Sequence, residues 1–101
     1  LDIKPVFRFA RGEVSPVARP RTRRRAIDRL VDETVSDIGT RPVHVAAIHA
    51  AAEDEAQQLL DAVVAKTHVR EAVLTEVTPV IGANTGPGLL GVAYFCERES
   101  S

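Results

Sequence analysis

The sequence predicts a domain of the α+β or α/β class, in which a single mixed β-sheet has two amphipathic helices packed on one face. Two segments repeat apolar residues at the helical spacing, and short apolar or alternating runs flank them in the order β-β-α-β-α-β-loop-β. An amphipathic helix buries one stripe, so two such helices are expected to cover one face of the sheet. The 101 residues, 45% of them hydrophobic, suffice for one core but not for two, so residues 1–101 are expected to form a single domain.

The first segment of the chain is expected to form a β-hairpin at an edge of the sheet. Apolar residues alternate loosely in 3–10, which is typical of a strand. Gly12 allows a turn, and residues 14–18 follow as a second short strand. Pro16 and Pro20 cannot donate a hydrogen bond to a neighbouring strand, which favours the edge position.

A long helix is expected to begin after Thr22 and to end at Gly39. Thr22 is a favourable N-cap residue, Gly39 is a favourable C-cap residue, and Pro42 blocks continuation of the helix. Residues at the helical spacing form one apolar stripe, which comprises Ile27, Leu30, Val31, Thr34, Val35 and Ile38.

The second half of the chain predicts a strand, a helix and two further strands. Residues 43–50 form a short apolar run, which is typical of a buried strand. Acidic residues at 53–55 open the second helix, where they suit the helix dipole. Its apolar stripe comprises Ala56, Leu59, Leu60, Val63 and Val64. Strands are expected over 71–77 and 89–96, and the unit 43–77 is expected to be a parallel crossover.

The charge of the chain is unevenly distributed. Residues 1–25 carry eight basic and two acidic side chains, whereas residues 26–76 carry four basic and ten acidic ones. A basic end favours an anionic partner, such as a nucleic acid, a phosphate, a carboxylate or an acidic protein surface. A pI of about 6.3, no Trp and one Tyr make a nucleic acid the least favoured of these partners.

The most basic segment is an arginine cluster at the start of the first predicted helix, formed by Arg21, Arg23, Arg24 and Arg25. Each cation in a first helical turn is unfavourable by about 0.3–1 kcal/mol, because the helix N-terminus is already positive. Cations beside free N–H groups can hold an anion, so the cluster is a candidate docking site for a partner. On this interpretation, replacing Arg23 and Arg24 by Glu leaves folding intact or slightly improves it, because acids suit a helix N-terminus. Alternatively, acidic residues one turn later neutralise the cluster: Asp28, Asp32 and Glu33.

A glycine-rich loop precedes the last predicted strand. Residues 82–88 lack the Lys-Ser/Thr pair of a P-loop, and they do not lie between a strand and a helix as a dinucleotide-binding motif does. Asn84 and Thr85 place an amide and a hydroxyl at the loop tip. The flanks are apolar and comprise Val80, Ile81, Leu89 and Leu90. Polar groups beside an apolar wall suit a ligand with a carboxylate head and an apolar tail, although a tight turn is the alternative interpretation.

No metal site and no nucleophile–base pair is predicted. His44 and His49 share a strand but lie five residues apart, so they should face opposite sides of the sheet, and His68 is expected in a loop. Cys96, the single cysteine, is expected to be a small buried residue; it excludes an internal disulfide, so a reducing compartment is the default. No apolar run approaches the ~20 residues of a membrane helix. The sequence has no Met, so we expect it to be a piece of a longer protein.

Several segments resemble the C-terminal domain of the DegV family. The resemblance rests on Lys4-Pro5, on Arg21-Thr22-Arg23-Arg24-Arg25-Ala26, on Gly91-Val92 and above all on Pro79-Val80-Ile81-Gly82-Ala83-Asn84-Thr85-Gly86-Pro87-Gly88. It runs in order through residues 4–95, and the glycine-proline loop is its specific part. The resemblance implies a bacterial, cytoplasmic two-domain protein of which the N-terminal domain is absent here.

The resemblance also implies a function. Members of the family bind a long-chain fatty acid between their two domains, with no catalysis or cofactor of their own, and some present its carboxylate to a fatty acid kinase. The implied head-group loop is Asn84, Thr85, Gly86, Pro87 and Gly88, the implied acyl-chain wall is Val80, Ile81 and Leu89, and the arginine cluster would dock the kinase. The family loop usually has His where this sequence has Asn84, which can donate a hydrogen bond but cannot carry a charge.

Two other classes of function stay open from the residues alone. One is a nucleic-acid- or acidic-protein-binding domain that uses the arginine cluster. The other is a small acyl-transferring or hydrolytic enzyme, for which the sequence offers no nucleophile–base pair.

Overall fold

The structure of the protein, a computed structural model, describes residues 6–10, 13–16, 22–77 and 88–97, with side chains described from residue 22 on. The elements follow one another as β1 (Val6–Ala10), β2 (Glu13–Pro16), α1 (Arg23–Ile38), β3 (Pro42–His49), α2 (Glu53–Lys66), β4 (His68–Glu76) and β5 (Leu90–Cys96). This order is the predicted one, and it confirms the predicted α+β class.

The strands form one mixed sheet in the spatial order β2-β1-β5-β3-β4. β1 and β2 form the predicted antiparallel hairpin, and β2, which contains Pro16, lies at an edge as its proline predicts. β3 and β4 are parallel, which confirms the predicted crossover. The last strand, β5, inserts between β1 and β3, parallel to the first and antiparallel to the second.

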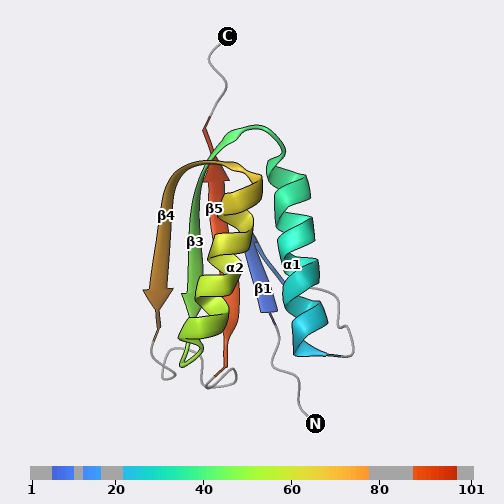
Figure 1. The fold of residues 1–101 in the computed structure, drawn as a ribbon, viewed down its shortest axis with the longest axis vertical. Helices are drawn as coiled ribbons and strands as arrows, with labels where there is room; N and C mark the ends of the chain where they lie inside the picture. Colours follow the sequence, from blue (N-terminus) through green and yellow to red (C-terminus); the bar gives the residue numbers. More distant parts are fainter. Residues whose placement is uncertain (1–5, 11–12, 17–21, 78–87, 98–101) are drawn as a thin grey trace.

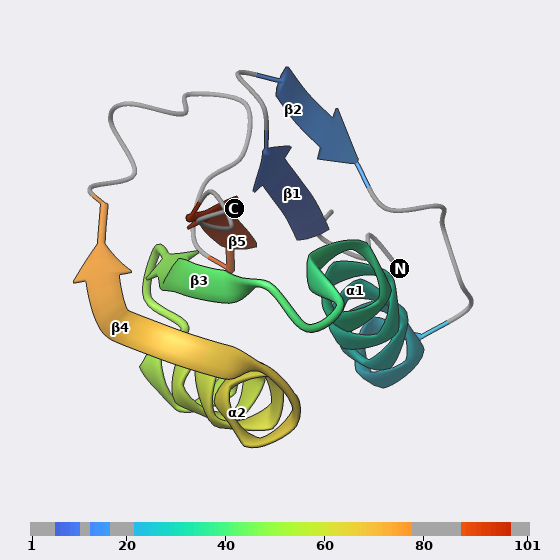
Figure 2. The ribbon, with the colours of Figure 1, turned by 90° about the horizontal axis from the view of Figure 1, so that it is seen from above.

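Both helices lie on one face of the sheet, as predicted (Figure 2). β3 alternates between partly buried and buried residues, and its buried side chains, Val43, Val45, Ala47 and His49, face the helices. Most of the predicted stripes are buried against them: Leu30, Val31, Thr34 and Ile38 of α1 and Ala56, Leu59, Leu60 and Val63 of α2. Ile27 and Val35 of the α1 stripe are only partly buried, and Ala26, which was not predicted, is buried. Val64 is an exception: it is 37% exposed, so its place in the predicted stripe is wrong.

Two further predictions need correction. His68 is not in a loop, because β4 begins there and pairs with Pro42 of β3. The reason is that Thr67, the C-cap of α2, already has extended backbone angles, so the chain passes from helix to strand without a loop. Cys96 is only partly buried, although it packs against the core as a small apolar residue would.

The helix ends follow local rules. The Thr22 hydroxyl accepts a hydrogen bond from the Arg25 amide at 3.1 Å, and Ala26 N–H donates to the Thr22 carbonyl at 3.0 Å, which confirms the predicted N-cap. Gly39 closes α1 with a φ of +63°, a value that favours glycine, and its N–H donates to the Val35 carbonyl.

A cluster of side chains around His44 joins three strands, at the end of the sheet opposite the helix N-termini. The His44 ring nitrogens contact two carboxylates, Glu97 through Nε2 at 2.7 Å and Glu71 through Nδ1 at 3.2 Å. The ring also stacks on Phe95, with ring centroids 4.5 Å apart and planes 5° apart. Hydrogen bonds to Glu97, and then to Glu71, raise the pKa of His44 above its usual 6.5, and they outweigh the opposing effect of burial.

This cluster predicts that stability falls as the pH rises. A raised folded-state pKa contributes stability that is complete below the unfolded value and is lost as the pH passes through the folded-state value. The free energy of unfolding is measured in urea between about pH 5.5 and about pH 9. The difference between the wild type and His44→Gln should be largest at the acidic end of this range. Glu97→Gln should reduce the pH dependence. A gap between wild type and His44→Gln that stays constant across this range would contradict the assignment.

Candidate functional site

The candidate site is one edge of the sheet, here named the carboxyl edge. It contains the ends of β3 and β4, the start of β5 and the first turns of α1 and α2 (Figure 1). Both helices begin at this edge because each runs antiparallel to β3: α1 leads into the strand and α2 leads out of it. In sheets with parallel strands and helical crossovers, ligands bind at the carboxyl ends of the strands, so this edge is the natural place for a site.

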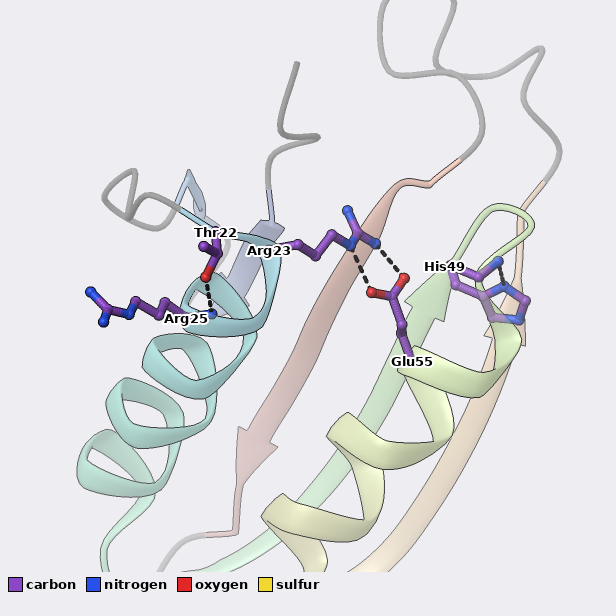
Figure 3. A network of polar contacts seen from close by, with 6 residues as sticks. Thr22, Arg23, Arg25, His49 and Glu55 are labelled. Atoms are coloured by element: carbon purple, nitrogen blue, oxygen red, sulfur yellow. Dashed lines mark hydrogen bonds and ion pairs between the residues drawn. The ribbon is translucent and has the colours of Figure 1, made fainter. Parts of the chain in front are cut away.

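Arg23 joins the two helix starts. Its Nε donates to Glu55 Oε2 at 2.9 Å and its Nη2 donates to Glu55 Oε1 at 3.0 Å, which is a bidentate ion pair between the first turn of α1 and the first turn of α2 (Figure 3). The side chains are 23% and 39% exposed, so the pair is partly shielded from water. This pair argues against the prediction that Arg23→Glu with Arg24→Glu leaves folding intact, because Glu at position 23 would face Glu55.

The other described arginines of the cluster are more exposed than Arg23. Arg24 is 79% exposed, and its nearest carboxylate is Asp28, at 3.6 Å. Arg25 is also exposed, and in Figure 3 its guanidinium extends away from α2. The predicted neutralisation by acidic residues one turn later is confirmed for Asp28, which pairs with Arg24, whereas Glu33 pairs with Arg29. Arg21 lies outside the described residues.

An open cleft of about 230 Å³ lies between α1 and α2 near these first turns. Apolar side chains line part of it, and charged or polar groups line the rest: Ile27, Val31 and Ala62, and Arg23, Arg24, Asp28, Glu55 and Gln58. The two basic groups are matched by two acidic ones, so the cleft offers no net charge to attract a carboxylate.

The glycine-rich loop is anchored at both ends on one dipeptide, His49-Ala50. Val77 N–H, just before the loop, donates to the His49 carbonyl at 2.8 Å, and Gly88 N–H, at its end, donates to the Ala50 carbonyl at 2.7 Å. Ala50 N–H in turn donates to the Leu89 carbonyl at 3.0 Å. Gly88 has a φ of +95°, which favours glycine at this position. The bases of the loop therefore lie directly beside the start of α2.

Most of the predicted ligand residues lie outside the described residues. These are Asn84, Thr85, Gly86 and Pro87 of the head-group loop and Val80 and Ile81 of the acyl-chain wall. Gly88 and Leu89 are described, and both lie at the carboxyl edge, beside Ala50. The head-group contacts therefore remain a prediction.

Two structurally important residues at this edge were not predicted from the sequence. His49 is 2% exposed, and its Nδ1 accepts a hydrogen bond from Ala52 N–H at 3.1 Å, so it supports the start of a helix whose N-cap residue has no capping side chain (Figure 3). Ala51 has a φ of +54°, which is uncommon for a residue other than glycine. The alternation of β3 could have placed His49 on the helix side, but no sequence signal marks Ala51.

Two negative findings apply to the part of the chain that the structure describes. No group of three or more His, Cys, Asp or Glu side chains there is arranged to hold a metal ion. Neither described helix is long and apolar enough to cross a membrane.

Comparison with known proteins identifies the family. The family model described as "Uncharacterised protein, DegV family" matches residues 1–97. The chain belongs to the DegV family. It is 40% identical over 98 residues to a DegV domain-containing protein of Streptomyces coelicolor, covering 91% of this chain and 33% of that protein. It is 34% identical over 97 residues to protein DegV of Bacillus subtilis, covering 93% of this chain and 34% of that protein.

Solved DegV structures share the fold. A hypothetical Thermotoga maritima protein, described as revealing a fatty acid binding function, matches 85% of this chain and 32% of its own with a TM-score of 0.71 and 24% identity. A DegV lipid binding protein from the same organism matches 88% of this chain and 32% of its own, with a TM-score of 0.72 and 23% identity. The chain thus spans about a third of the length of the DegV relatives that it matches.

The Arg23–Glu55 pair predicts a measurable coupling. In a double-mutant cycle with Arg23→Gln and Glu55→Gln, we expect about 1 kcal/mol of coupling in the free energy of unfolding, because the pair is bidentate but still partly exposed. The matched control is Arg24→Gln with Asp28→Asn, a longer and more exposed pair that should couple by only about 0–0.3 kcal/mol. Equal coupling in the two cycles would contradict a special role for Arg23.

Proposed function

We propose that this chain is the C-terminal part of a DegV protein that binds a long-chain fatty acid. The observation that carries the proposal is the anchoring of the glycine-rich loop: both of its bases are held on His49-Ala50, at the edge where the helix N-termini meet. On this proposal, Asn84 and Thr85 lie between these two anchored ends in the chain. Its resemblance to the family's head-group loop and the fatty acid binding function ascribed to a Thermotoga relative give the ligand class.

The proposed site divides the ligand into two parts. Asn84 and Thr85, with the loop backbone, hold the carboxylate by hydrogen bonds. Val80, Ile81 and Leu89 form part of the wall along the acyl chain. The N-terminal domain of the full-length protein supplies the rest of the site. On this proposal the protein is a cytoplasmic carrier, which needs no cofactor and performs no catalysis of its own.

We further propose that some of the arginines dock a fatty acid kinase. Arg24 and Arg25 support this proposal, because both are exposed at the same edge as the loop bases. Arg23 is less suited to this role, since its guanidinium is engaged by Glu55. A kinase bound through Arg24 and Arg25 would reach the carboxylate from the side of the helix N-termini.

Ligand identity is tested first on the full-length protein. Organic extraction of the purified protein followed by mass spectrometry should release about one long-chain fatty acid per chain, as expected for a site largely formed in the fold. Absence of any acyl ligand, together with no heat signal on titration with oleate, would reject the proposal.

Asn84 is the residue to vary in the same protein. Asn84→His should tighten oleate binding by about five- to tenfold near pH 6 and by less near pH 8, because a charged donor binds a carboxylate more strongly. Asn84→Ala should weaken binding at both pH values, since one carboxylate lone pair loses its donor. Asn84→Gly controls for a purely conformational role. If calorimetry gives one affinity for all these variants, Asn84 does not contact the head group.

The docking proposal has its own prediction. Arg24→Gln with Arg25→Gln in the full-length protein should reduce kinase-dependent acyl phosphate formation about tenfold, while the bound fatty acid is unchanged, because complementary charge governs the encounter more than the lipid site. Arg29→Gln with Lys66→Gln removes the same number of charges elsewhere on the helices and is the control. A loss of bound fatty acid in the first variant would place these arginines in the lipid site and reject docking.

A further inference from the structure

The sheet has a second face that neither helix covers. Alternation along β3 turns His44, Ala46 and Ile48 away from the helices, and the register extends these positions into rows across three strands. The rows are Phe95–His44–Glu71, Ala93–Ala46–Val73 and Gly91–Ile48–Thr75. These nine residues are here named the outer face. In Figure 2 both helices lie on the opposite side of the sheet.

The composition of the outer face does not fit a surface made for water. A sheet face that meets solvent normally carries polar side chains, in alternation with the apolar residues of the buried face. Two of its three rows carry no charge. Val73 and Thr75 of these rows are exposed, Val73 by 43%, whereas Ala46, Ile48 and Ala93 are partly buried and Gly91 is buried; Phe95, in the row of His44, is 63% exposed. Ala46, Ala93 and Gly91 leave a low strip between the larger Ile48, Val73 and Phe95. Large apolar side chains exposed together on one face of a sheet mark an interaction site.

The remaining row forms a polar rim. His44, Glu71 and Glu97 satisfy one another, and Arg70 lies 3.6 Å from Glu97. Because these groups are already paired, they need no partner of their own. Apolar side chains beside a row of paired polar groups are the composition of a protein–protein or interdomain interface.

We propose that the outer face is the surface on which the remaining two thirds of the full-length DegV protein pack. The length of the relatives supports this occupant over a second copy: the chain covers only about a third of each, and on this proposal the rest of the polypeptide is tethered to it. A tethered partner has a high effective concentration, so a modest apolar surface suffices to hold it. The inference concerns how the domains join and does not depend on lipid binding.

Thiol protection tests the proposal on the full-length protein. In a background in which Cys96 and any other cysteine are replaced by Ser, Val73→Cys should react with iodoacetamide about tenfold more slowly than Val64→Cys, because packing removes Val73 from solvent. Val64 is the matched control, since it is the same residue type, it is 37% exposed, and it lies on α2 rather than on the outer face. If circular dichroism shows that Val73→Cys does not fold, Thr75→Cys replaces it.

Equal rates for the two cysteines would overturn the proposal. A second copy is distinguished by repeating the measurement at concentrations where light scattering gives a monomer. Protection that persists in the monomer supports packing within one polypeptide, whereas protection that disappears on dilution assigns the outer face to a dimer and also overturns the proposal.

Discussion

The direction of β3 constrains the arrangement of the whole molecule. α1 leads into this strand and α2 leads out of it, so the two helices run parallel and their N-termini lie at the same edge (Figure 1). Two positive dipole ends side by side are unfavourable unless negative charge lies between them. The acids at 53–55 supply that charge, and Glu55 binds Arg23 directly. Arg23, which is unfavourable in α1 considered alone, is thus explained by the neighbouring helix.

The same strand end also positions the candidate site. His49 is buried on the helix side of β3, supports the start of α2 through its ring, and accepts a hydrogen bond from Val77 through its carbonyl. Ala50, the next residue, holds the other base of the loop. Helix start and loop bases are therefore coupled through two adjacent residues, so a change at this turn should disturb both.

The two faces of the sheet have different roles. One face, packed under α1 and α2, holds the core, and the β3 side chains on it are buried. The outer face combines a self-satisfied polar rim around His44 with apolar rows that the described helices leave open. A domain in which helices cover one face of the sheet and leave apolar side chains on the other face is consistent with a part of a larger protein. The chain covers only about a third of its DegV relatives, which agrees with this.

Local chemistry in the sequence determined the elements: Thr22 and Gly39 bound α1, the helical stripes gave the buried face, Pro16 placed a strand at an edge, and the glycine-proline loop pointed to the DegV family. These signals act within a few residues, so they can be read without knowing the fold. Only the tertiary structure decided that β5 inserts between β1 and β3, that Arg23 meets Glu55, and that His49-Ala50 anchors the loop. Such contacts join residues that are far apart in the chain, and their energies depend on strand order and register, which no local pattern encodes.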